Sequence, residues 1–304
     1  INNLEVFGHK EYGVSAQAYG SIIWKGGGAW DNTRKLSSGD MDTGGASLVV
    51  LGDYVKPVIV TNARFDQNTN GVGLYVFTQG PVTLTNISAN NNGYDGVRSF
   101  NASSVSVLRT IPAGNNTFSN NGLVYTGGHG LYIMADKNVV LNRVEAIGNS
   151  GAGAMIQSEM GGSVTVTGTS NLPAEFSGNL GYHQGTSTSL HAGLEISAYG
   201  IKLTNIRASS NHGAGIFLSS WGSSVSILGT LNEFSGNSIS AGWTTQQYGL
   251  WVDQAYGPVT ILNFKADGNY GGGIHIDNTA GTGSVTLNST VAGFTSSVTD
   301  GEGS

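Results

Sequence analysis

Residues 259–276 read Val-Thr-Ile-Leu-Asn-Phe-Lys-Ala-Asp-Gly-Asn-Tyr-Gly-Gly-Gly-Ile-His-Ile, and this stretch decides the fold. Turn residues interrupt it at 262–263 and at 269–273. Between the interruptions, apolar side chains recur at every second position, in the pairs Val259/Ile261, Phe264/Ala266 and Ile274/Ile276. A period of two residues is typical of a β-strand with one buried face. The stretch therefore predicts three short strands bent around a core.

The same three-strand pattern recurs along the chain, as expected for a solenoid of stacked rungs. Spacings between successive rungs are 23–26 residues for short rungs and 34–37 for long ones. We predict that rungs start near Ile22, Val58, Val82, Val105, Val139, Val164, Ile201, Val225, Val259 and Val285. One domain, residues 1–298, should contain all of them. Residues 26–57 are the least regular, and we expect either a rung with an inserted loop or a local excursion in which 47–51 could form a strand. Residues 299–304 should form a flexible polar tail.

Composition narrows the possible functions. The chain has 304 residues, of which 38% are hydrophobic and 11% charged, with a net charge of −6. A negative chain with thirteen Lys and Arg does not have the charge of a nucleic-acid-binding protein. No apolar run is long enough for a transmembrane helix, and the absence of cysteine excludes disulfides and thiolate metal sites. A surface rich in Ser, Thr, Asn and Gly is common in secreted β-proteins.

A second pattern crosses the rungs: Phe or Ala, two further residues, and then Asn. Phe and Ala alternate in the sequence Phe65, Ala89, Phe118, Ala146, Phe176, Ala208, Phe234 and Ala266, and Phe294 continues it. The Asn positions are Asn68, Asn92, Asn121, Asn149, Asn179, Asn211, Asn237 and Asn269. A large side chain stacked on a small one allows core layers to interdigitate, so the structural unit should be a pair of rungs.

Two interpretations of the Asn column are open. Asn tolerates left-handed backbone geometry, so it suits any turn. Alternatively, the side-chain amides form a buried ladder, each bonded to the backbone and to Asn residues in adjacent rungs. Eight consecutive occurrences at one offset favour the ladder. Neither interpretation makes these residues catalytic.

The sequence resembles the right-handed parallel β-helix of the pectate-lyase-like superfold. The resemblance lies in the three-strand rungs, the Asn turn and the motif Gly-x-Gly followed by alternating aliphatic residues. The repetitive sequence resembles the repeat arrays of large bacterial surface and adhesin-type proteins. The resemblance covers essentially residues 1–300 and implies an all-β fold of about ten to eleven rungs, roughly 50 Å long. It does not imply one function, since that superfold includes lyases, hydrolases, tailspikes and adhesins.

Catalytic residues are not evident. The Asp residues considered, at positions 95, 136, 253, 267 and 277, fall on different rungs and turns, so we expect solvated turn residues rather than a Ca²⁺ site. Gly128-His129-Gly130 matches one of four motifs that polygalacturonase-like enzymes share, but the other three are missing, and His129 is expected to be a loop residue. The remaining His residues have no metal-ligand spacing. We therefore predict no catalytic residue, no metal and no cofactor.

Aromatic residues provide a stronger indication of a contact surface. On the third strand of each rung, the residue between the two inward positions should point outward. On successive rungs it is Tyr75, Arg98, Tyr132, Met155, Glu195, Phe217, Trp251 and His275. Half of this column is aromatic, which predicts contact with sugar rings or with another subunit. The alternative is that loops of the long rungs fold back and cover it.

Those loops lie at 122–129, 180–192 and 238–248, and they carry Tyr125, Tyr182, Trp243 and Tyr248. Because they leave the same point of the cross-section, they should stack along one edge. Insertions on one face of a solenoid often mark its binding face.

Two functions are open, and the first of them is suggested by both ends of the sequence falling inside a rung. The first is a non-enzymatic extracellular structural protein whose copies join end to end in a filament or stalk of a surface or adhesin assembly. A piece of one longer repetitive chain would explain the ends equally well. The alternative function is carbohydrate binding, or polysaccharide lyase or hydrolase activity, with glycans or host surfaces as partners. Carboxylates converging with Lys or Arg on one face of adjacent rungs would favour the enzyme.

Overall fold

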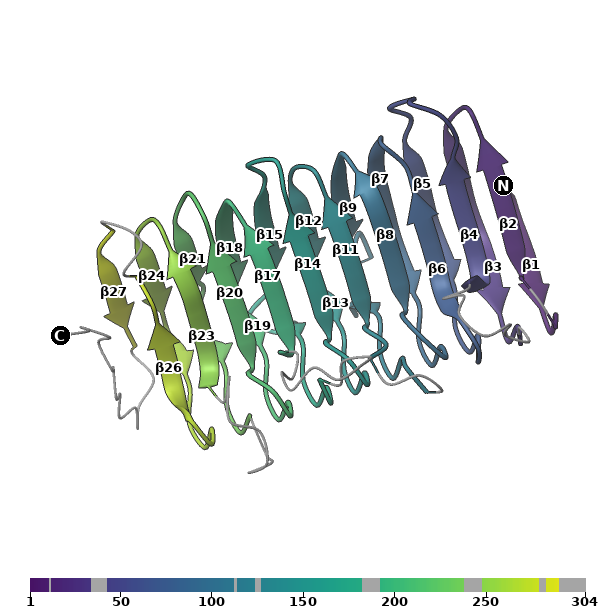
Figure 1. Ribbon diagram of the computed structural model, residues 1–304. Coiled ribbons are helices and arrows are strands. Elements are labelled where there is room, and N and C mark those ends of the chain that lie inside the picture. Colours follow the sequence, from purple (N-terminus) through teal and green to yellow (C-terminus); the bar gives the residue numbers. More distant parts are fainter. Residues whose placement is uncertain are drawn as a thin grey trace.

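The computed structural model describes residues 1–10, 12–33, 43–111, 114–123, 127–181, 192–237, 248–278 and 283–289, and all regular elements in these ranges are β-strands. They form two sheets, and every strand pair is parallel. Figure 1 shows the strands of successive rungs stacked side by side along one axis, from β1 and β2 at one end to β26 and β27 at the other. The predicted all-β parallel β-helix is confirmed.

The smaller sheet has ten strands and contains the third strand of each rung. Its members, in chain order, are β2 (Val14–Ala18), β4 (Thr43–Val50), β6 (Val72–Phe77), β8 (Val97–Ala102), β11 (Leu131–Ala135), β14 (Ala154–Ser158), β17 (Leu194–Ala198), β20 (Ile216–Ser220), β23 (Tyr248–Ala255) and β26 (Gly272–Ile276).

The larger sheet has seventeen strands and contains the first and second strands of the rungs. Its members are β1 (Asn2–Phe7), β3 (Ile22–Trp30), β5 (Val58–Arg64), β7 (Pro81–Ser88), β9 (Ser104–Leu108), β10 (Asn116–Thr117), β12 (Val139–Asn142), β13 (Val144–Glu145), β15 (Ser163–Thr167), β16 (Ala174–Glu175), β18 (Gly200–Thr204), β19 (Ile206–Arg207), β21 (Val225–Leu228), β22 (Asn232–Glu233), β24 (Val259–Leu262), β25 (Phe264–Lys265) and β27 (Val285–Asn288).

The register of the larger sheet follows the sequence repeat. Ile22 pairs with Val58, Val58 with Val82, and the row continues through each predicted rung start to Val285. Between the first and second strands the chain bends at single residues with positive φ, including Asn62 (53°), Asn205 (53°) and Asn263 (50°). Asn adopts this conformation at lower cost than most residues. The bend changes the direction of the chain while apolar side chains continue to point into the core on both sides of it.

The described parts of residues 26–57 include two strands. β3 runs to Trp30, and β4 (43–50) takes its place in the ten-stranded sheet between β2 and β6. Ala29-Trp30-Asp31-Asn32 fits the motif of Phe or Ala followed by Asn, and Ala29 is fully buried. Three consecutive glycines (26–28) interrupt the apolar alternation just before it, so the sequence predicts the start of this rung at Ile22 but not its place in the motif.

The core contains the alternating layer. Side chains of Phe65, Phe118, Phe176 and Phe234 are completely buried, as are the Ala residues between them, while Ala266 is partly buried. Trp24 stands next to Phe65 in an edge-to-face contact with a centroid distance of 5.4 Å. Phe294 lies outside the described residues. Large and small side chains thus occupy successive layers of one continuous core.

The Asn residues form a ladder that begins at Asn32 and continues to Asn269. At each step the backbone N–H and the Nδ2 group of one Asn donate to Oδ1 of the Asn in the next rung. Bond lengths are 2.9 Å at both contacts between Asn121 and Asn149. Asn149, Asn179 and Asn211 have no exposed surface. Buried amides without partners would be costly, and the ladder satisfies them.

Glycines before the third strand make room for this ladder. A Cβ atom on Gly153 would lie 2.8 Å from Asn179 Nδ2, and one on Gly215 would lie 2.6 Å from Asn237 Nδ2. Both distances are too short for a real contact, so a side chain there would displace the Asn amide. This explains why a Gly precedes the third strand in so many rungs.

Candidate functional site

The predicted outward column is a single register row on the ten-stranded sheet. Strand pairing connects its members from Tyr75 through Arg98, Tyr132, Met155, Glu195, Phe217 and Trp251 to His275. All are partly buried except Arg98, which is 6% exposed. The row is therefore a half-covered surface.

Aromatic contacts divide the column into two groups. Phe100 connects the first group, with ring-centroid distances of 6.1 Å to Tyr75 and 5.3 Å to Tyr132. In the second group, Trp251 stands 5.4 Å from Phe217 and 5.7 Å from His275.

Tyr248, predicted as a loop contact residue, begins β23 and stacks on His275 at 4.8 Å with an interplanar angle of 21°. Tyr125, Tyr182 and Trp243, the other predicted loop contacts, lie outside the described residues. The described part brings Tyr248 to the column and leaves the other three unplaced.

The turn before β8 contains a buried ion pair that the sequence analysis missed. We expected Asp95 to be solvated, and this is wrong, because Asp95 has no exposed surface. Its Oδ2 accepts a hydrogen bond from Arg98 Nε at 2.6 Å, and its Oδ1 accepts one from the backbone N–H of His129 at 2.7 Å. The two residues stand three apart across a turn, so no periodic pattern marks them.

Aromatic rings surround the buried guanidinium. Arg98 Cζ lies 4.6 Å from the ring centroid of Tyr94 and 5.3 Å from that of Tyr132. Such contacts stabilise a cation when it is removed from water. The pair fixes the turn at 94–98 against the following rung.

Burial raises the pKa of Asp95 to about 6, against the opposing effects of Arg98 and the His129 N–H. Nδ1 of His129 accepts a hydrogen bond from the backbone N–H of Ala152 at 2.9 Å, and the residue is 7% exposed. Both groups are occupied by structural contacts, which favours a role in holding rungs together over a role in acid–base chemistry.

A second row of charges lies on the short strands of the larger sheet. Register places Glu145 beside Glu175, Arg207 beside Glu233, and Glu233 beside Lys265. Arg207 lies 3.2 Å from Glu233 and 3.7 Å from Glu175, and Lys265 lies 3.6 Å from Glu233. Carboxylates and basic residues thus do meet on adjacent rungs, contrary to the dispersed arrangement that we expected.

This row consists of ion pairs between rungs. Its basic members bridge carboxylates of neighbouring rungs, and Arg207 and Lys265 are 40% and 44% exposed. Burial, followed by the charge of Glu175, raises the pKa of Glu145. The ion pairs connect neighbouring rungs along the sheet. Because they are half-exposed, each pair contributes little to stability individually.

The described residues contain neither a metal-binding cluster nor a membrane-spanning helix. No group of three or more potential metal ligands is present among them. They also include no helix that could cross a membrane.

Comparison with known proteins identifies the family. The family described as right handed beta helix region matches residues 1–180 and 46–231, and the chain belongs to this family. The matches together cover most of the chain and agree with the parallel sheets. No curated protein and no solved structure matches the chain. The family contains both enzymes and non-enzymes, so membership defines the fold and leaves the activity open.

Proposed function

We propose that the protein is a rigid, non-enzymatic structural element of an extracellular surface assembly. The observation that supports this most directly is the unbroken Asn ladder from Asn32 to Asn269. Two hydrogen bonds connect each rung to the next, and they are buried at every step except the last, between Asn237 and Asn269. A charged-residue content of 11% supports an extracellular setting and weak repulsion between copies. End-to-end association of copies stays a prediction from the sequence.

Two measurements on the purified chain test this proposal. Small-angle X-ray scattering should give an elongated particle with one long axis, because the rungs are stacked in one direction. Incubation with acidic and neutral polysaccharides should release neither new reducing ends nor unsaturated products. Turnover that copurifies with the chain and disappears in Trp251→Ala would overturn the non-enzymatic assignment.

A second candidate function is polysaccharide binding along the outward column. It is favoured by the two aromatic groups, around Phe100 and around Trp251, which lie in one register row. Aromatic side chains on such a surface offer apolar faces to sugar rings. The row runs along the solenoid axis, so an extended glycan could contact several rungs.

Affinity electrophoresis in gels containing polysaccharide tests this candidate. Trp251→Ala should reduce the retardation, whereas Trp221→Ala should not, because Trp221 is 39% exposed and lies outside the column. Equal retardation of both variants and the parent would exclude the column as the binding surface.

A further inference from the structure

One corner of the coil, where the third strand of a rung turns into the first strand of the next, carries most of the exposed aromatic side chains. Five of the eight that the structure describes lie there, and the other three are Phe7, Tyr12 and Tyr270. Figure 1 shows the turns of this corner side by side along the upper edge of the stack. We call its large exposed side chains the corner row, which consists of Tyr19, Tyr54, Val55, Met160, Tyr199, Trp221 and Tyr256.

The corner row is held in place by contacts within the chain. Four of its residues donate their backbone N–H to a carbonyl oxygen of the preceding rung over 2.6 to 3.2 Å: Met160 to Asp136, Tyr199 to Gly162, Trp221 to Ala198, and Tyr256 to Ser220. Tyr19 and Tyr54 make an edge-to-face contact with a centroid distance of 6.3 Å. The ring of Tyr199 lies so close over Gly222 that no Cβ atom would fit there. A partner would therefore meet an ordered surface, at little entropic cost.

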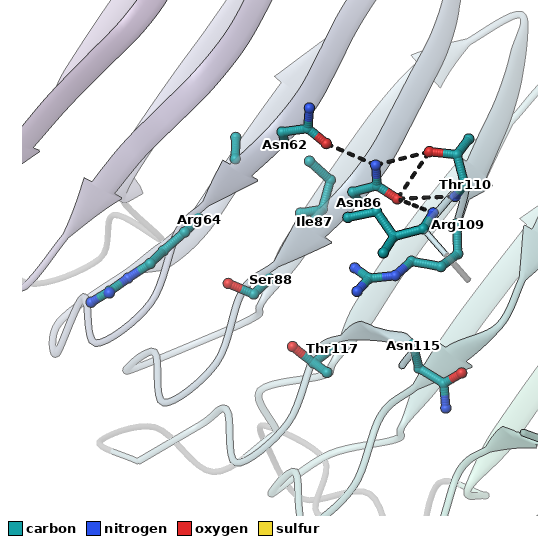
Figure 2. Close-up of a pocket in the computed structure, with 11 residues that line it drawn as sticks. Asn62, Arg64, Asn86, Ile87, Ser88, Arg109, Thr110, Asn115 and Thr117 are labelled. Carbon is teal, nitrogen blue, oxygen red and sulfur yellow. Dashed lines mark hydrogen bonds between the residues drawn. The ribbon is translucent and has the colours of Figure 1, made fainter. Parts of the chain in front are cut away.

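The neighbouring corner, at the bend between the first and second strands, is polar instead. Figure 2 shows Asn86 there between Asn62 and Thr110. Asn86 Nδ2 donates to Asn62 Oδ1 at 2.7 Å and to Thr110 Oγ1 at 2.9 Å, and its Oδ1 accepts from the Thr110 N–H at 3.0 Å. The amide of Asn86 is thus satisfied within the chain. The corner row, by contrast, leaves a line of apolar side chains in water, which is typical of a contact surface.

Charged residues accompany the corner row in a fixed order. Between β4 and β5, Asp53 precedes Tyr54 and Val55, and Lys56 follows them; between β11 and β12, Asp136 directly precedes Lys137. Among the described residues, none of these four charges has an ion-pair partner. In both turns the chain therefore crosses the corner from an unpaired acid to an unpaired base.

We propose that the corner row is the interface of a dimer in which two copies of this chain lie side by side and point in the same direction. The twofold axis of such a pair is parallel to the stack, so each rung meets the same rung of the second copy and the crossing direction is reversed. Asp136 then faces Lys137 of the second copy, Asp53 faces its Lys56, and the apolar side chains meet their counterparts. In an antiparallel pair centred on the row, Asp136 would face Asp136.

The size of the corner row allows a weak dimer. It spans nine rungs, from the turn after β2 to the turn after β23, which is about 38 Å at the usual strand spacing. Contact over a width of about 15 Å would bury about 1,200 Å² in total, the lower limit for specific interfaces. We therefore expect a dissociation constant on the order of micromolar. The dimer goes beyond the proposed function and does not depend on it.

Sedimentation velocity of the purified chain from about 1 to about 100 μM, a range that brackets this value, tests the proposal. The sedimentation coefficient should rise with concentration as dimers form. Met160→Lys should raise the dissociation constant about tenfold or more, because two like charges would face each other across the axis. Tyr270→Lys is the matched control, since Tyr270 is 61% exposed in the turn before β26, outside the row, and its replacement should leave the constant unchanged.

Single cysteines report the orientation, because the chain has none of its own. With a short thiol-specific cross-linker, Tyr19→Cys alone and Tyr256→Cys alone should each give a covalent dimer. Asp136→Lys should weaken the dimer severalfold, and adding Lys137→Asp should restore it. A monomer at every concentration, equal weakening by Met160→Lys and Tyr270→Lys, no restoration by the double replacement, or cross-linking only when the two cysteine variants are mixed would each overturn the proposal.

Discussion

At the scale of single residues, the molecule depends on a few buried polar groups whose partners come from other rungs. Each Asn of the ladder from Asn68 to Asn237 is an acceptor for the rung before it and a donor to the rung after it, whereas Asn269 only accepts. Asp95 also connects two rungs, because it accepts hydrogen bonds from Arg98 in its own rung and from the backbone N–H of His129 in the next. Replacing such a residue therefore affects two rungs.

Asn149→Ala should be strongly destabilising. It removes the acceptor of the Asn121 N–H and Nδ2 groups and leaves both buried, at a cost of about 1–3 kcal/mol for each unsatisfied group. Urea unfolding measures the loss. Asn171→Ala is the control, because Asn171 is exposed in a turn, and a change within about 0.5 kcal/mol is expected. Equal unfolding midpoints for the two variants would contradict a stabilising ladder.

Asp95 should make stability fall as pH rises from about 4 to about 6. Its folded pKa of about 6 is above the ordinary value of 3.8, so in this window the folded state keeps a proton that the unfolded state has lost. The contribution of Asp95 to the free energy of unfolding is fully present below pH 3.8. It decreases by about 3 kcal/mol as the pH rises through 6.

Urea midpoints measured from pH 3.5 to pH 7 check this dependence. Asp95→Asn cannot titrate at this position, so the difference between parent and variant isolates the effect. A difference that grows with pH in favour of the parent would mean that the ion pair with Arg98 outweighs burial.

At the scale of elements, most strands follow from the apolar alternation, and the rung starts could be predicted to the residue because they all face one core. The ladder and the layered core could be predicted for the same reason, since each repeats at a fixed offset. The rung that starts at Ile22 was predicted, but Ala29 and Asn32 were not included in the motif, because glycines 26–28 interrupt the alternation. The Asp95–Arg98 pair could not be predicted, because it occurs in a single turn and does not repeat at a fixed offset along the chain.

Phe176→Ala should cost about 3–5 kcal/mol, because the ring is completely buried between the small layers at Ala146 and Ala208. Those neighbours cannot fill the space, so a cavity should remain. Denaturant unfolding gives the loss, and Phe176→Leu, which keeps most of the volume, should lose clearly less. An unchanged midpoint in Phe176→Ala would show that the layer is not packed as described.

At the scale of the whole molecule, the contacts run along one axis, and each rung touches only its neighbours. In the middle of the described chain, strands such as β12 have both partners and alternate between buried and half-buried residues. At the outermost positions, β1 and β27 are mostly exposed. Stability should therefore decrease from the centre of the stack toward its two ends.

Hydrogen exchange detects this gradient. Backbone amides of β1 and β27 should exchange faster than those of β12 and β15 by about two orders of magnitude or more, because opening an outer rung disrupts one interface instead of two. Peptide-level mass spectrometry resolves these segments. Uniform protection from 2 to 288 would indicate that the stack opens as one cooperative unit.

The order of large over small layers also restricts how a gene for such a protein can change in length. Duplicating or losing one rung would place two phenylalanines or two alanines in direct contact at the junction, giving either a clash or a void. Duplicating two rungs preserves the order, and 58 residues separate Phe118 from Phe176 and Phe176 from Phe234. Longer and shorter descendants of this sequence should therefore differ by whole pairs of rungs.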